Sequence, residues 1–70
     1  MTPVRQEILT LLGRLSDLAP DMRFGQLIAN LSYEAVGPTV EAIWDMEDEQ
    51  LLVALRQFVS DLSQRHSGVA

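Results

Sequence analysis

The 70-residue sequence contains no cysteine, no lysine and a single histidine. The absence of cysteine excludes a disulfide and a thiolate metal site, and one histidine argues against a zinc site. A chain of this length buries only about 60% of the surface that its unfolded form exposes. We therefore expect marginal stability, with an oligomer or a partner as the source of further burial.

Basic residues are few and scattered, which argues against several classes of partner. The five arginines are dispersed, and the net charge is −5. Nucleic-acid affinity depends on clustered lysine and arginine, so we expect no nucleic-acid partner. No apolar run approaches the roughly 20 residues of a membrane span, and the N-terminus lacks the pattern of a signal peptide. The sequence therefore predicts a cytoplasmic location and no membrane partner.

Apolar residues recur at helical spacing in three stretches, which is typical of core-facing helices. In the first stretch, Thr2 is the expected N-cap and Pro3 the first helical residue. The third stretch follows the four acidic residues Asp45, Glu47, Asp48 and Glu49 and is expected to end between residues 64 and 66. Leu9 and Val53 fall outside the apolar faces of these two helices. The core-facing residues are expected to be Val4, Ile8, Leu11, Leu15, Leu18, Leu51, Leu52, Leu55, Phe58, Val59 and Leu62.

The middle stretch is expected to form the central helix, with Asp21 as its N-cap. It should run from about residue 22 to residue 34 or 36, where Gly37 and Pro38 end it. The short connection around Pro20 favours an antiparallel hairpin with the first helix. Its apolar sector should comprise Phe24, Leu27, Ile28, Leu31 and Ala35.

These patterns predict an all-α fold with one domain over residues 1–70. We expect a small three-helix bundle with a short helical or irregular segment, residues 39–44, before the last helix. Residues 67–70 are expected to fray.

The middle helix has two further faces. Its polar stripe consists of Arg23, Gln26, Asn30 and Tyr33. The stripe is expected to be either the solvated side of the helix or a partner surface, and Asn30 favours the second interpretation because asparagine is a poor mid-helix residue. The small residues Gly25, Ala29 and Ser32 let another backbone come close. We expect internal packing there, with a homodimer contact as the alternative.

Trp44 and the acidic residues around it allow structural and functional interpretations. We expect Trp44 to seal one end of the core, and the alternative is a binding anchor. The acidic residues are expected to cap the last helix and promote solubility; the alternatives are a docking patch for a basic partner and, least favoured, a metal site. The run lacks the glycine of a calcium-binding loop. These acids are Glu41, Asp45, Glu47, Asp48 and Glu49.

Two segments resemble a pattern in small bacterial proteins of unknown activity. Residues 23–30, RFGQLIAN, are similar to an R-[FL]-G-Q-L segment, and residues 44–51, WDMEDEQL, to an aromatic-x-x-E-D-E-x-L segment. The resemblance implies no activity or ligand. It suggests a structural lock in which Arg23 or Gln26 pairs with Glu47, Asp48 or Glu49.

Catalysis has little support, because no serine has an evident base and no phosphate-binding loop is present. We expect a non-enzymatic protein–protein interaction module that forms a homodimer, without a cofactor, metal ion or small-molecule substrate. The alternative is an acidic inhibitor or immunity-type protein that neutralises a basic toxin or nuclease. A three-helix DNA-binding domain fits the helix count but conflicts with the charge. The candidate partner-binding residues are Arg23, Gln26, Asn30, Tyr33, Trp44, Glu47, Asp48 and Glu49.

Overall fold

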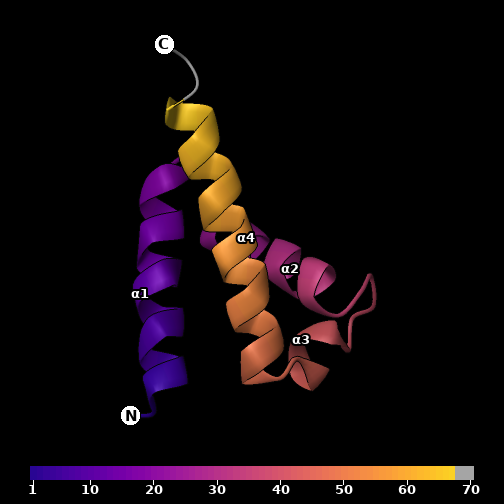
Figure 1. Ribbon diagram of the computed structural model, residues 1–70. Helices are drawn as coiled ribbons and strands as arrows, with labels where there is room; N and C mark the ends of the chain where they lie inside the picture. The colour runs from indigo at the N-terminus through magenta and orange to yellow at the C-terminus, as the bar shows by residue number, and fades with distance from the viewer. Residues whose placement is uncertain (68–70) are drawn as a thin grey trace.

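The computed structural model describes residues 1–67 of the chain and the side chains of residues 1–65. Its helices are α1 (Pro3–Leu18), α2 (Phe24–Ala35), α3 (Ala42–Asp45) and α4 (Asp48–Ser67), shown in Figure 1. This confirms an all-α bundle of three longer helices with a short helical segment before the last. None of the helices within residues 1–67 is both long and apolar enough to cross a membrane. The fraying expected at the C-terminus lies outside the described residues, except for Ser67, which belongs to α4.

The helix α4 is the centre of the fold, because both α1 and α2 pack on it. At 100° per residue its apolar side chains cover an arc of roughly 160°, which is wide enough to serve two neighbours. The middle helix, α2, was expected to be central, and this expectation is wrong. The α4 residues that are buried or partly buried in the core are Leu51, Leu52, Ala54, Leu55, Phe58, Val59 and Leu62.

The helices α1 and α4 lie side by side and run in the same direction (Figure 1). Near their N-terminal ends, Nε of Arg5 donates to Oδ2 of Asp48 at 3.0 Å. Farther along, the guanidinium of Arg56 donates two hydrogen bonds of 2.9 Å to the carboxylate of Glu7. All four side chains are well exposed, so each pair contributes at most about 1 kcal/mol. The ion pairs therefore help to set the register, and apolar burial supplies most of the stability.

The expected antiparallel hairpin of α1 and α2 is not formed. After α1, the Met22 N–H donates to the carbonyl of Ala19 at 3.2 Å and closes a turn. Pro20 occupies the second position of this turn, where its fixed φ is favourable. Asp21 is the third turn residue, so it is not the N-cap of α2; Arg23 is. From there α2 diverges from α1 and packs on α4 and α3.

The start of α1 follows the predicted capping chemistry, whereas α4 is capped by a glutamine that the sequence analysis did not single out. Oγ1 of Thr2 accepts a hydrogen bond of 3.2 Å from the Arg5 N–H, and Pro3 is the first residue of α1. Before α4, the N–H of Glu47 donates to Oε1 of Gln50 at 2.8 Å, which is the side chain-to-backbone half of a capping box. Asp48 and Glu49 lie in the first turn of α4, where their negative charges interact favourably with the positive end of the helix dipole.

The connection from α2 to α4 folds back on α2. Gly37 ends α2 with a φ of +152°, which glycine adopts without strain. Its N–H and that of Val36 both donate to the carbonyl of Ser32. The chain then enters α3, where Ala42 is fully buried as α3 packs on α2. The predicted helical segment is thus confirmed, and α3 reaches one residue beyond its expected end.

We predict that Leu55→Ala lowers the free energy of unfolding by about 2–5 kcal/mol, because Leu55 is fully buried on the central helix. Urea denaturation followed by circular dichroism measures this change. Val53→Ala is the matched control on the same helix, since Val53 is 64% exposed, and its effect should stay within about 0.5 kcal/mol. Equal effects of the two substitutions would contradict the assignment of the core.

Candidate functional site

The predicted polar stripe lies on α2 and its N-cap. Arg23, Gln26 and Tyr33 are exposed, in agreement with the expected solvated side of the helix. Asn30 has a local partner, since its Nδ2 donates to Sδ of Met22 at 3.6 Å. This contact links α2 to the turn that precedes it and gives Asn30 a structural role as well.

The acidic residues at the start of α4 do not pair with α2. Asp48 binds Arg5 of α1, as described above. Neither Arg23 nor Gln26 forms the expected bond with the acids of residues 47–49 in the part of the chain that the structure describes, so the predicted lock between α2 and the acidic turn is wrong. The physical reason is the parallel packing of α1 and α4, which brings an α1 arginine to the start of α4.

Trp44 is not part of the core, because it is 90% exposed. The prediction that it seals one end of the core is therefore wrong. The helix α3 buries Ala42 against α2, and at 100° per residue Trp44 lies 200° farther round the helix axis. Its side chain consequently leaves α3 on the side away from α2. The sequence contains no second tryptophan.

Two other expectations for α2 are also wrong. Phe24 was placed in the core but is 53% exposed, because it is the first residue of α2 and lies at the end of the helix, beyond the buried turn that contains Leu27. Gly25 and Ala29 were expected to pack internally, but both are exposed, and a Cβ at Gly25 would meet nothing within 4 Å. Of the three small residues only Ser32 is buried, and its Oγ donates to the carbonyl of Ala29 at 2.8 Å.

An open depression of about 560 Å³ lies between the outer side of α2 and the segment that leads into α3. We call it the α2–α3 hollow. Sequence reasoning missed it, because it depends on how residues 37–43 fold back on α2. Its walls include the exposed side chains of Tyr33, Val40 and Ile43. The full lining is Ala29, Ser32, Tyr33, Gly37, Pro38, Thr39, Val40 and Ile43.

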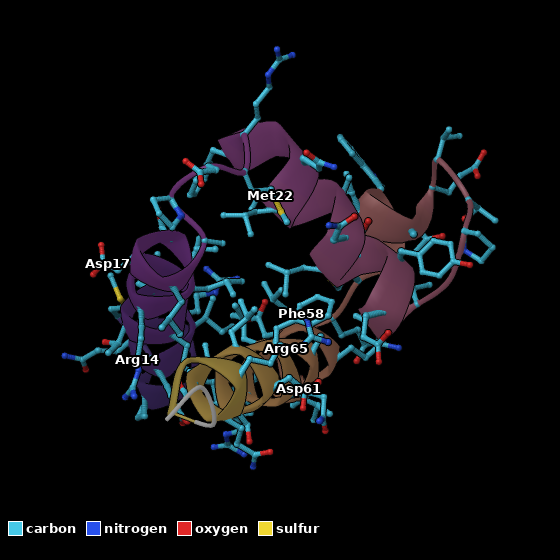
Figure 2. All side chains as sticks on the ribbon, turned by 90° about the horizontal axis from the view of Figure 1, so that it is seen from above. Arg14, Asp17, Met22, Phe58, Asp61 and Arg65 are labelled. Carbon is cyan, nitrogen blue, oxygen red and sulfur yellow. The ribbon has the colours of Figure 1, made fainter. Side chains whose placement is uncertain are left out.

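A smaller hollow of about 190 Å³ lies where α1 and α2 diverge. Figure 2 shows Met22 and Phe58 pointing into the space between α1, α2 and α4, and Arg14 and Asp17 on the outer side of α1. The volume is below the 300–1,000 Å³ typical of ligand pockets. We interpret this hollow as a packing gap that Met22 covers, and not as a ligand site. Its lining is Leu15, Met22, Leu27, Asn30, Phe58, Asp61, Leu62 and Arg65.

Leu9 and Val53 are exposed, as their positions off the apolar faces predict. Leu9 borders an open depression of about 810 Å³ between α1 and the start of α4. Val53 borders one of about 390 Å³ beside Glu34 and Glu49. Apart from the terminal Met1, Leu9 is the one large exposed apolar side chain that lines the first depression, and Val53 is the one that lines the second. The α2–α3 hollow is lined by three such side chains, those of Tyr33, Val40 and Ile43.

The negative charge of the chain is concentrated in residues 24–49, although none of these acids lines the α2–α3 hollow: Glu34 and Glu49 border the depression beside Val53, and Asp48 borders the one beside Leu9. Residues 24–49 contain six acidic residues and no basic residue, whereas acidic and basic residues balance in residues 1–23. Of these six, Asp48 alone has an arginine partner among the described side chains. The acids are spread along the surface, and within the described residues no group of three could hold a metal ion. The arrangement is therefore suited to attracting a cationic surface and offers no ligand cage.

Comparison with known proteins found no matching family model, no similar curated protein sequence and no similar solved structure. The resemblance to small bacterial proteins stays a prediction.

We predict that acrylamide quenches the fluorescence of Trp44 almost as strongly in the folded protein as in urea. The reason is that the indole is already exposed to solvent before unfolding. Circular dichroism in the same titration reports when the helices unfold. A large increase in quenching at that point would show that Trp44 is packed in the folded state.

Proposed function

We propose that the protein is a non-enzymatic protein–protein interaction module that docks a partner at the α2–α3 hollow and Trp44. The observation that carries the proposal is the 90% exposure of both Val40 and Trp44. Single apolar residues are common on protein surfaces, whereas neighbouring ones around a hollow are typical of interaction sites. Tryptophan and tyrosine are also among the residues that contribute most to binding energy.

The packing of the chain supports the same interpretation. Gly25 and Ala29 stand one helical turn apart on the exposed surface of α2, and Ala29 also lines the α2–α3 hollow. Small side chains let the backbone of a partner approach the helix closely. A partner segment could therefore lie along α2 and insert a side chain into the hollow.

An acidic inhibitor or immunity-type protein is the second candidate. The observation that favours it is the concentration of six acidic residues in residues 24–49. Such a protein would neutralise a basic toxin or nuclease by covering its cationic site, with fast association from electrostatic steering. A homodimer and a cytoplasmic location stay predictions.

We predict that Val40→Ser/Ile43→Ser abolishes capture of the partner from a lysate of the cells that naturally contain the protein. The two substitutions remove apolar walls of the hollow at exposed positions, so the fold should be retained. Affinity capture followed by mass spectrometry compares this variant with wild type. Sedimentation of the purified chain detects self-association in parallel.

Leu9→Ser/Val53→Ser is the matched control, because it removes two exposed apolar side chains elsewhere on the surface. This control should retain every partner that wild type captures. Partners lost from the control and kept by the hollow variant would move the interaction site away from the α2–α3 hollow.

A further inference from the structure

We propose that α2 is the contact helix of a homodimer, in which the outward face of α2 packs antiparallel on the same face of a second copy, with Ala29 at the centre. This inference rests on the proposed function, because it names the partner that covers α2 and the hollow beside it. Three features carry it: the uncharged outward face of α2, the complementary sizes of Gly25 and Tyr33, and the extent of the exposed apolar surface.

The outward face of α2 is the side opposite the core. Leu27 and Leu31 are buried, and at about 100° per residue Ala29 points away from both. Glu34 is the one charged residue in residues 24–36, and it lies about 140° round the helix from Ala29. A surface helix usually carries its charged residues on the side opposite the core, so an uncharged face there is unusual. The exposed residues within about 60° of Ala29 are Gly25, Gln26 and Tyr33.

An uncharged face suits a second copy of an acidic chain. The net charge is −5, so two copies repel each other wherever their acidic residues meet. A two-fold dimer places the same patch of each subunit against the other. The residues that line the α2–α3 hollow are uncharged as well. Two copies can therefore meet through α2 and the hollow without bringing carboxylates together, and this contact supplies the further burial that so short a chain needs.

The outward face of α2 is complementary to itself in shape. Gly25 and Tyr33 stand four residues before and four residues after Ala29. A two-fold axis at Ala29 that makes the two α2 helices antiparallel places Tyr33 of each copy next to Gly25 of the other. A Cβ at Gly25 would meet nothing within 4 Å, and Tyr33 is 61% exposed, so the ring has space to enter. Rows of residues spaced by four lie parallel when two helices cross at about −50°, the commonest packing class.

The hollow extends this contact, because α2 alone is too small for a stable dimer. The 12 residues of α2 span about 18 Å, whereas a stable interface buries about 800 Å² on each subunit. Val40 and Ile43 continue the apolar surface beyond Tyr33, and they are 90% and 50% exposed. Trp44 leaves α3 on the side away from α2 and stays outside the contact. The surface is at the small end for a dimer, so we expect the dimer to dissociate on dilution.

Sedimentation equilibrium of the full chain at increasing concentration measures the dimer. We predict that Ala29→Glu weakens dimerisation by about tenfold or more, because it brings two carboxylates together at the two-fold axis. Ala29→Arg should have the same effect. An equimolar mixture of the two variants should associate within about threefold of wild type, because opposite charges then face each other. Ala29 is exposed, and glutamate and arginine are good helix formers, so the fold should be retained.

Gly13 on α1 provides the matched controls, since it is exposed and a Cβ there would also meet nothing within 4 Å. Gly13→Glu adds the same charge away from α2 and should change dimerisation by less than about twofold. A second pair tests the place of Tyr33. Gly25→Gln fills the space that the ring of the other copy would enter and should weaken dimerisation about tenfold, whereas Gly13→Gln should leave it unchanged. Circular dichroism verifies that each variant is folded.

Several results would overturn the inference. These are a wild-type chain that is monomeric at every concentration, equal effects of substitutions at Gly13 and on α2, or no association in the mixture of Ala29→Glu with Ala29→Arg. The proposed function fails separately, through retention of the captured partner by Val40→Ser/Ile43→Ser. A different protein that this variant loses, together with a wild-type chain that sediments as a monomer, would leave the function standing and exclude the second copy.

Discussion

The structure depends on the broad apolar arc of α4. Leu55 at its middle is fully buried, and Leu52 and Ala54 lie toward its two edges. One edge receives α1 and the other receives α2, so the three longer helices share one core although α1 and α2 diverge. A chain of this length has little apolar surface to bury, and this arrangement lets one helix supply the core contact of two others. The parallel packing of α1 and α4 follows, since α2 and α3 return the chain to the start of α1.

The same constraint explains why α3 is left without a partner on one side. α4 is occupied by α1 and α2, so α3 packs on α2. A helix of four residues that buries Ala42 against a single neighbour must expose most of its circumference. Trp44 is exposed for this reason, and Val40 before it lies in the connection that folds back on α2. The apolar surface around the α2–α3 hollow is thus a consequence of how the core is divided among the helices.

Much of the fold follows from periodicity and capping. The start of α1 at Thr2 and Pro3, the end of α2 before Gly37 and the apolar faces of α1 and α4 are local properties of the sequence, and the structure confirms them. The prediction of an antiparallel hairpin was wrong because it used loop length alone. Loop length does not reveal that the apolar arc of α4 is wide enough for both α1 and α2 to pack on it. That arc was visible in the seven apolar positions of α4, but its use by two neighbours is a tertiary property.

The candidate site was less predictable for a related reason. Hydrophobicity alone placed Trp44 in the core, but burial depends on which neighbour α3 meets. Once Ala42 is known to face α2, the exposure of Trp44 follows from helical geometry. The pairing of Asp48 likewise depends on the direction of α1, which no local pattern contains. The exposure of Tyr33, by contrast, was predictable from the polar stripe of α2.

A small protein with an exposed apolar surface, such as that around Trp44, is prone to self-association. In this protein the acidic residues near that surface oppose self-association through it. Glu41 and Asp45 lie next to Trp44 round α3, on the side away from Ile43, and residues 24–49 contain no basic residue. Two copies that meet through this surface must bring these acids together and desolvate them, which offsets part of the gain from apolar burial. A cationic partner reverses the sign of this contribution. The acids beside Trp44 therefore disfavour a second copy at this side of α3 and favour a basic partner.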